Sequence, residues 1–161
     1  MLGRLNNYIK FWIHRWLFTY NYQFVLERGA KMPVRIYNND AGYDLFVSKS
    51  VMARARSMVN VPTGVSCKSE IPAWILLTGR SSTLSNYGLM VNEGIIDGDY
   101  TGELFIKVYN PKNEDVYIPK DMRIGQIIVL PHTNIKFNKV VKIQNQSINV
   151  RGNRGFGSSG V

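Results

Sequence analysis

Cysteine and histidine are scarce in this sequence: Cys67 is the one cysteine, and His14 and His132 are the two histidines. A single cysteine excludes an internal disulfide framework and a cysteine-rich zinc site, and two histidines argue against a histidine-built metal centre. No stretch approaches the roughly 18 consecutive apolar residues that a membrane-spanning helix needs. We therefore expect an intracellular protein, cytoplasmic or nuclear, that does not depend on disulfides.

Acidic residues are also in the minority. The 20 basic and 11 acidic residues leave a net charge of +9, which admits nucleic acid, an anionic membrane or a small polyanion as a partner. Beyond residue 31 the positive excess is spread thinly, which disfavours a nucleic-acid-binding stripe. With 45% apolar and 19% charged residues, the 161-residue chain has the composition of one globular domain rather than of a disordered chain.

The first 31 residues differ from the rest of the chain. They hold eight of its 19 aromatic residues and a net charge of +4, and Leu5, Ile9, Trp12 and Trp16 fall at helical spacing. Such a segment can contact a membrane surface or act as a targeting peptide, although the absence of serine argues against a mitochondrial presequence. The alternative is an extension without function, preceding a domain that starts at Met32.

From Met32 onward the pattern predicts an all-β domain, residues 32–150, followed by a glycine-rich segment, residues 151–161. Short runs rich in Val, Ile, Tyr and Phe alternate with turn clusters at 38–40, 62–64 and 111–113. This pattern favours a β-sandwich or jelly roll with one short helix at 82–87. The predicted strands are 34–37, 44–47, 57–61, 64–69, 74–78, 104–109, 116–118, 124–130 and 136–143.

Two stretches have the composition of anion sites. The sequence GRSST at 79–83 places Arg80 and three hydroxyls at the start of the predicted helix, where free N–H groups and a guanidinium favour an anion. A plain Ser/Thr helix cap is the alternative. The tail RGNRGFGSSG at 151–160 combines arginines and serines with one aromatic, Phe156, which needs a flat partner such as a nucleobase. A flexible terminal tail is the alternative there.

A third stretch, GIIDGDYTGE at 94–103, holds a carboxylate and an aromatic ring close together. Its three glycines predict a short β-arm that bends back on itself. Next to two phosphate-binding elements, Asp97 can orient and deprotonate a water for attack on phosphorus. Tyr100 can pack its ring against a sugar, where a 2′-hydroxyl would collide, so this ring selects deoxyribose. A plain β-hairpin with a polar tip explains the same spacing.

Taken in order, these stretches resemble the five motifs of the homotrimeric dUTP diphosphatases, the dUTPases. AGYDL at 41–45 resembles the first motif, GRSST at 79–83 the second, and GIIDGDYTG at 94–102 the third. RIGQII at 123–128 resembles the fourth motif and the tail at 151–160 the fifth. Ser82 and Ser159 stand where Gly and Thr are common in that family. The resemblance covers roughly residues 32–161.

The resemblance implies a jelly-roll or distorted-barrel homotrimer with three active sites at subunit junctions, the C-terminal segment being swapped between chains. It implies hydrolysis of dUTP to dUMP and pyrophosphate, which limits uracil in DNA and supplies dUMP for thymidylate synthesis. Asp97 would activate the water that attacks the α-phosphate, Tyr100 would stack on the deoxyribose, and Asp44 would support the site or the interface. Magnesium (Mg²⁺) would bind the triphosphate and water rather than protein side chains.

The remaining substrate contacts that the resemblance implies fall into three groups. The phosphates would be held by Arg80, Ser81, Ser82 and Gln126. The backbone of the arm would read uracil over residues 92–105, where the contacting residues are Asn92, Ile95, Ile96 and Phe105. The tail would close as a lid over the site, through Arg151, Phe156, Gly157, Ser158 and Ser159.

Two other readings stay open beside the enzyme. The GRSS form of the second motif also occurs in the related dCTP deaminases, but Lys107 stands where their catalytic glutamate belongs, and a lysine cannot shuttle protons as that glutamate does. A catalytically idle trimer of the same fold that tethers a partner or a membrane through residues 1–31 is the second alternative. Intact Asp97, Tyr100, Arg80 and the glycine-rich tail favour the dUTPase over the idle trimer, and Lys107 favours it over the deaminase.

Overall fold

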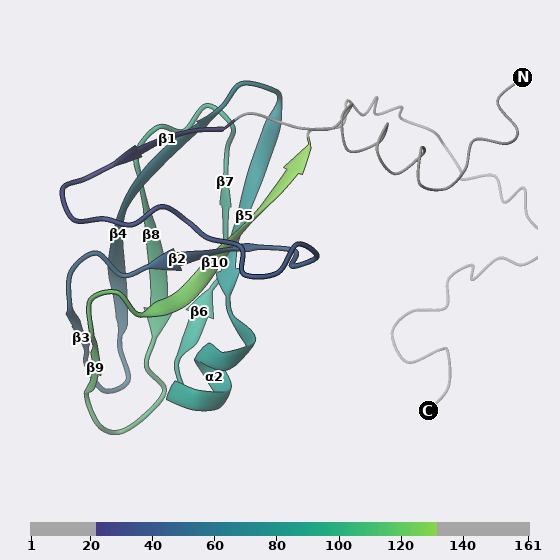
Figure 1. Cartoon of the computed structure of the whole chain (residues 1–161). Helices are drawn as coiled ribbons and strands as arrows, with labels where there is room; N and C mark the ends of the chain where they lie inside the picture. Colours follow the sequence, from purple (N-terminus) through teal and green to yellow (C-terminus); the bar gives the residue numbers. More distant parts are fainter. Residues whose placement is uncertain (1–21, 132–161) are drawn as a thin grey trace, which may run out of the picture.

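Two antiparallel sheets face each other across an apolar core in the computed structural model, which describes residues 22–131 (Figure 1). The first sheet has the strand order β1-β4-β8-β6 and the second has the order β2-β10-β5-β7. A small two-stranded sheet, β3-β9, lies beside them. The strands of the first sheet are β1 (Tyr22–Leu26), β4 (Met58–Ser69), β8 (Glu103–Tyr109) and β6 (Met90–Asn92). Those of the others are β2 (Tyr43–Phe46), β10 (Arg123–Pro131), β5 (Ala73–Gly79), β7 (Gly94–Ile96), β3 (Val51–Ala53) and β9 (Val116–Ile118).

Alternation along the strands builds the core. In β8, Leu104, Ile106 and Val108 are buried, and the residues between them face solvent. They join one apolar cluster with residues of the second sheet such as Ile75 and Leu77 of β5. The predicted all-β class is therefore confirmed, as a sandwich in which neither sheet closes on itself within residues 22–131.

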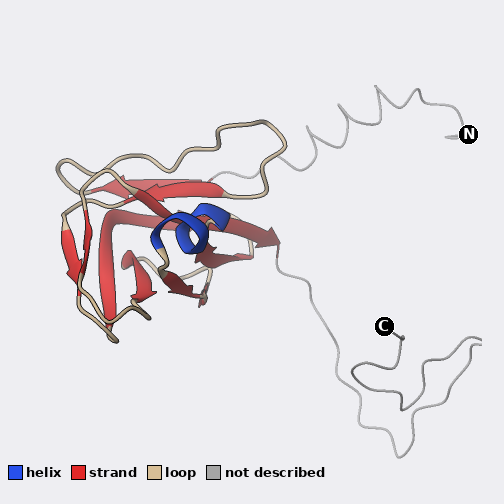
Figure 2. Cartoon of the chain, turned by 90° about the horizontal axis from the view of Figure 1, so that it is seen from below, coloured by secondary structure: helices blue, strands red, loops and turns tan. Residues whose placement is uncertain are grey.

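The expected short helix is present as α2 (Ser81–Tyr87), one residue longer than predicted. It follows β5 directly and lies at the lower end of the sandwich in Figure 1, so it is in front in Figure 2, which views the molecule from below. The Thr83 hydroxyl is buried and donates to the carbonyl of Ile124, 2.7 Å away, so the helix is tied to β10. Among residues 22–131, no helix is long and apolar enough to cross a membrane.

Two predicted local structures differ from the observed ones. The predicted strand 34–37 is only an isolated bridge between Val34 and Asp44. The predicted turn at 62–64 lies inside β4, whose pairing with β8 shifts register between Pro62 and Ser66. Gly64 takes a positive φ of 64° there, which a side chain would disfavour, so the strand kinks instead of ending.

The domain begins earlier than the predicted boundary at residue 32. β1 pairs with the second half of β4, with Tyr22 opposite Ser69 and Phe24 opposite Cys67. Tyr22 and Phe24 are half-buried against the core. Residues 22–31 therefore belong to the sandwich, and the role predicted for the earlier residues lies outside the described residues, as do the predicted strand 136–143 and the tail.

The arm, residues 94–103, also differs from the expected hairpin. β7 pairs with β5 in the second sheet, whereas β8 pairs with β4 and β6 in the first. The arm therefore crosses from one sheet to the other through a tight turn in which the Tyr100 N–H donates to the Asp97 carbonyl, 3.1 Å away. Gly98 lies so close to the Ala73 carbonyl that a Cβ would collide with it.

Candidate functional site

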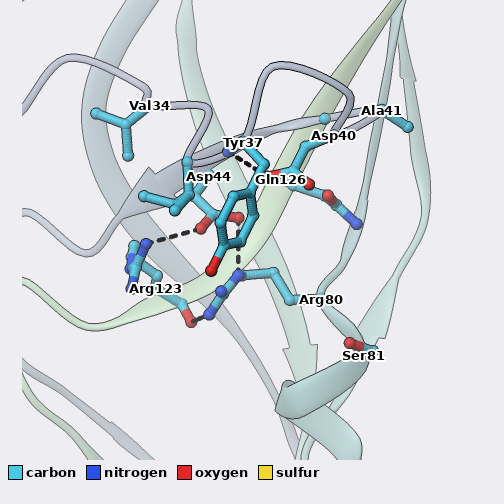
Figure 3. Close-up of a pocket in the computed structure, with 11 residues that line it drawn as sticks. Val34, Tyr37, Asp40, Ala41, Asp44, Arg80, Ser81, Arg123 and Gln126 are labelled. Carbon is cyan, nitrogen blue, oxygen red and sulfur yellow. Dashed lines mark hydrogen bonds and ion pairs between the residues drawn. The ribbon is translucent and has the colours of Figure 1, made fainter.

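A pocket of about 470 Å³ lies between β2, β10, the start of α2 and the loop before β2 (Figure 3). We call it the arginine pocket. The pairing of β10 with β2 and β5 places Gln126 opposite both Asp44 and Thr78, so three of the sequence motifs meet at this point of the second sheet. The pocket is lined by Val34, Ile36, Tyr37, Asp40, Ala41, Gly42, Asp44, Arg80, Ser81, Arg123 and Gln126.

Asp44 is the buried centre of this pocket, with 8% of its surface exposed. One carboxylate oxygen accepts a hydrogen bond from Arg80 Nε at 2.7 Å, and the other accepts one from Arg123 Nη1 at 3.1 Å. A buried carboxylate needs such partners, since an unpaired buried charge is strongly destabilising. Asp44 thus fixes two guanidinium groups side by side.

The two arginines keep donors free on the pocket side. Arg80 Nη1 donates to the Arg123 carbonyl at 3.1 Å and to Ser82 Oγ at 3.4 Å. Within residues 22–131, Arg80 Nη2 and the Ser81 hydroxyl have no protein partner. Guanidinium and hydroxyl donors fixed around a hollow are suited to an anion with several oxygens. The Ser/Thr cap alternative does not hold, because α2 begins without a side-chain cap.

Gln126 joins the pocket to the end of β5. Its Nε2 donates to the Gly79 carbonyl, 3.0 Å away, and its side chain lies against Gly42. A Cβ at Gly42 would collide with the amide end of that side chain, so a larger residue there would force Gln126 to move from its present position. Ser82 does not line the pocket; its hydroxyl accepts a hydrogen bond from Arg80 and so contacts the pocket only through that residue.

Acidic side chains in the described part of the chain do not form a metal centre. Within residues 22–131, no three His, Cys, Asp or Glu side chains are grouped around a point that could hold one ion. Both oxygens of Asp44 are engaged by guanidinium groups. That donor set does not fit a directly bound Mg²⁺, so a metal bound only through the substrate stays a prediction.

The arm presents its two predicted functional side chains to solvent. Asp97 is exposed, and Tyr100 is 45% exposed with its hydroxyl donating to the Glu103 carbonyl at 3.1 Å. Ile95 and Phe105 are also exposed, and Asn92 lies at the exposed face of β6. Ile96 differs, because its side chain packs on the core and leaves only its backbone for a ligand.

The arginine pocket and Asp97 lie at opposite ends of β5. The register pairs Ile96 with Ile75 and packs Gly98 against Ala73, so Asp97 lies beside the beginning of that strand. Arg80 follows its last residue, Gly79. At about 3.3 Å per residue, the six steps from residue 74 to Arg80 separate Asp97 from the arginine pocket by roughly 20 Å. One chain therefore does not bring its carboxylate to its own pocket.

Three of the pocket residues, Arg123, Tyr37 and Asp40, were not among the site residues predicted from the sequence. Arg123 could have been predicted as a site residue, because it is the first residue of the fourth motif. Tyr37 and Asp40 carry no such signal, because they precede the first motif in a loop that was predicted to be partly strand. The predicted tail residues Arg151, Phe156, Gly157, Ser158 and Ser159 lie outside the described residues.

Comparisons with known proteins show the family and the fold of this chain. The family model described as dUTPase matches residues 28–160. The chain is 32% identical over 136 residues to a deoxyuridine 5'-triphosphate nucleotidohydrolase of Paramecium bursaria Chlorella virus 1, covering 84% of this chain and 94% of that protein. It is 37% identical over 138 residues to the protein of the same name from Helicobacter hepaticus, covering 84% and 85%.

A solved structure of the Staphylococcus bacteriophage 80alpha dUTPase with dUPNHPP is similar in fold. It superposes with a TM-score of 0.76 at 30% sequence identity, over 88% of this chain and 99% of that chain. The predicted jelly-roll architecture is thereby confirmed alongside the all-β class.

Proposed function

The chain belongs to the dUTPase family, and from this premise we propose that it hydrolyses dUTP to dUMP and pyrophosphate. This reaction limits uracil in DNA and supplies dUMP for thymidylate synthesis. The observation that carries the proposal is the convergence of three motifs on one pocket, where Asp44 fixes Arg80 and Arg123 with donors left over for an anion. The deaminase alternative is disfavoured by Lys107, which is exposed on the outer face of β8.

The arginine pocket would bind the phosphates. Arg80 and Ser81 supply free donors, and Gln126 has a second amide hydrogen beyond the one given to Gly79. Ser82 would act by holding Arg80 rather than by touching a phosphate. Magnesium would arrive as part of the substrate, bound to the triphosphate and to water, and would offset its negative charge.

The arm would carry the chemical step. The Asp97 carboxylate would accept a proton from a water molecule as the water oxygen bonds to the α-phosphorus. The bond from that phosphorus to the bridging oxygen of the pyrophosphate breaks at the same time, so pyrophosphate leaves and dUMP remains. Tyr100 would pack on the deoxyribose, and the arm backbone at residues 92–105 would read the uracil edge.

The separation of roughly 20 Å between the arm and the arginine pocket supports a homotrimer in which one chain supplies the arm and a neighbour supplies the pocket. The tail residues Arg151, Phe156, Gly157, Ser158 and Ser159 would close the site from the third chain. Both statements rest on the family resemblance and are proposals for this chain.

The direct test is turnover by the full chain with dUTP, dCTP and UTP in magnesium, reading pyrophosphate and ammonia separately. We expect pyrophosphate from dUTP, little from UTP because Tyr100 would exclude the 2′-hydroxyl, and no ammonia. Ammonia from dCTP would establish a deaminase instead. A folded oligomer inactive on all three nucleotides would favour the binding-module alternative.

A further inference from the structure

Tyr37 occupies an unusual place for an aromatic side chain. It lines the arginine pocket although it is 72% exposed, the largest exposure among the large hydrophobic side chains of residues 22–131. Figure 3 shows its ring extending over the pocket with the hydroxyl directed to the side where Arg80 and Arg123 lie. Its hydroxyl has no hydrogen-bond partner among the described residues.

The backbone of Tyr37 is held in place from both sides by Asp40. The Tyr37 N–H donates to the Asp40 carboxylate at 2.9 Å, and the Asp40 N–H donates to the Tyr37 carbonyl at 3.1 Å. The Asp40 oxygen that accepts the hydrogen bond from the Tyr37 N–H is therefore engaged within the loop itself. With the backbone fixed, only the two side-chain torsions of Tyr37 remain to aim its hydroxyl.

Arg35 fastens the same loop from outside. Its Nη1 donates to the carbonyls of Asn38 and Asp40, at 3.3 and 3.4 Å, and its guanidinium lies over the Tyr43 ring, 4.6 Å from the ring centre. It also donates to the Tyr43 hydroxyl. Tyr43 belongs to β2, so the loop that carries Tyr37 is anchored to the strand that carries Asp44.

The charge balance of the arginine pocket explains why a neutral donor would be useful. Its charged lining residues are Arg80 and Arg123 against Asp40 and Asp44, so the lining is formally neutral. The positive charges of the two arginines are therefore balanced by two carboxylates, and neutral donors such as Ser81 and Gln126 must help to hold a strongly anionic ligand. A phenol adds a hydrogen-bond donor without adding charge, and its rigid ring orders at low entropic cost.

From these contacts we propose that the Tyr37 hydroxyl is a phosphate ligand, donating to an oxygen of the outer phosphates of a nucleoside triphosphate bound in the arginine pocket. The assignment rests on the proposed function for the identity of the nucleotide. It makes Tyr37 a determinant of specificity for the triphosphate over the monophosphate product, which lacks those phosphates.

The test compares Tyr37→Phe with the wild-type full chain. Tyr117, on β9 and 59% exposed, does not line the pocket, and Tyr117→Phe is the matched control. Calorimetry measures binding of the non-hydrolysable dUpNHpp, of inorganic pyrophosphate and of dUMP, and kinetics gives KM and kcat for dUTP. Both tyrosines are exposed, so neither change removes a buried contact.

We expect Tyr37→Phe to weaken binding of dUpNHpp and of pyrophosphate by about tenfold, as for a neutral donor lost to a charged acceptor. The KM for dUTP should rise in parallel, while kcat and dUMP affinity change less than about twofold. Tyr117→Phe should behave as wild type. Equal affinities in Tyr37→Phe and wild type, with normal dUTP turnover, would overturn the assignment and leave the proposed function standing.

Tyr37→Ala separates the hydroxyl from the ring. If it weakens triphosphate binding as much as Tyr37→Phe does, the hydroxyl is the ligand. If only Tyr37→Ala has an effect, the ring acts as an apolar wall and the assignment is wrong. If the wild-type chain binds pyrophosphate with a contribution from the Tyr37 hydroxyl but does not hydrolyse dUTP, then the proposed function fails and the phosphate contact survives.

Discussion

The arginine pocket and the arm are built in opposite ways. In the pocket, the functional side chains hold one another: Asp44 is buried between Arg80 and Arg123, and Gln126 is bonded to the end of β5. In the arm, Asp97 and Tyr100 project into solvent, and what is fixed is the backbone beneath them.

The difference shows how the work of the site is divided. A phosphate-binding surface must hold several donors at defined positions before the ligand arrives, and ion pairs buried in one chain can do this. A carboxylate that activates water needs its environment completed by the substrate and by whatever encloses it. The exposed arm is therefore the half of the site that must be completed by another protein surface.

The largest effect is expected from Asp97→Asn. The amide keeps the shape of the side chain but cannot take a proton from water, so kcat for dUTP should fall by about 10³-fold. Binding of dUpNHpp should stay within about threefold of wild type, because the pocket is untouched. Calorimetry and pyrophosphate release measure the two quantities. Unchanged turnover would exclude Asp97 as the base.

Mixing two inactive variants tests whether the pocket and the arm come from different chains. Arg80→Met removes a phosphate donor and leaves Asp44 paired with Arg123. When Asp97→Asn and Arg80→Met chains are coexpressed in equal amounts, about a quarter of the sites should regain an intact pocket and an intact arm. Differently tagged chains allow mixed oligomers to be purified. No recovery in such oligomers would place both halves of a site in one chain.

Truncation at the N-terminus should have the next largest effect. Removing residues 1–31 deletes β1 and uncovers β4 around Cys67, and the loss of two half-buried aromatics and their strand pairing should cost about 4 kcal/mol of unfolding free energy. Removing only residues 1–20 leaves β1 in place. Urea titration of both proteins and of the full chain measures the change.

If the 1–31 deletion were as stable as the full chain, β1 would be dispensable and the predicted domain start at Met32 would be restored. The loss of β1 should disturb the arm more than it disturbs the arginine pocket. Glu27 follows β1, and its N–H donates to the Gly64 carbonyl at 2.8 Å. Gly64 lies at the kink in β4 and donates its own N–H to Glu103, the last residue of the arm.

Much of this molecule was predictable from its residues, but for different reasons in different places. The strand at 104–109 alternates clearly between buried and exposed residues, the strand at 124–130 is a mostly apolar run, and both were confirmed almost to the residue. β1 was missed because the aromatic residues before it made residues 1–31 look like a separate segment. Tyr22 and Phe24 in fact alternate with polar or exposed neighbours, which is the strand pattern.

The site likewise contains some residues that the sequence predicted and others that it did not. The GRSST stretch indicated Arg80 and Ser81, and the family resemblance added Asp44 and Gln126; the structure brings all four together. No spacing rule can show that Asp97 lies at the far end of β5, because that depends on which sheet edge the arm joins. Nor can it place Tyr37, whose position depends on bonds from Arg35 and Asp40 in an irregular loop.

Glu103 should contribute less to the free energy of unfolding than β1 does. At the root of the arm, one of its carboxylate oxygens accepts from the N–H groups of Thr63 at 3.0 Å and Gly64 at 2.7 Å. Glu103→Ala leaves both groups unpaired and should cost about 2 kcal/mol, lowering Tm by about 8 °C. Glu103→Gln keeps an acceptor oxygen and should cost less than half of that.

The same two variants sharpen the comparison between the two regions. If Glu103 supports only the arm, Glu103→Ala should lower kcat while pyrophosphate affinity, a property of the arginine pocket, stays unchanged. Equal losses in both would show that the arm and the pocket are coupled through the sandwich.

The smallest effect is expected from alkaline pH, acting on the paired strands β1 and β4. Burial raises the pKa of the Cys67 thiol above its ordinary 9.0, and burial also raises the pKa of Tyr22, on the facing strand, above 10.0. The unfolded chain therefore loses these protons before the folded chain does. Stability is complete below pH 9 and declines as the pH rises above it, by at most about 1.4 kcal/mol per pH unit for one group.

Cys67→Ala removes the larger part of this dependence, because Cys67 is 6% exposed and has the lower ordinary pKa of the two. Urea titrations at pH 8, 9 and 10 should give a falling free energy of unfolding for wild type and a flatter one for Cys67→Ala. A slope unchanged by the substitution would mean that the thiol is as accessible to water as in the unfolded chain. Since Cys67 lies opposite Phe24 of β1, such a result would also weaken the case that β1 is what covers this half of β4 and, through it, the root of the arm.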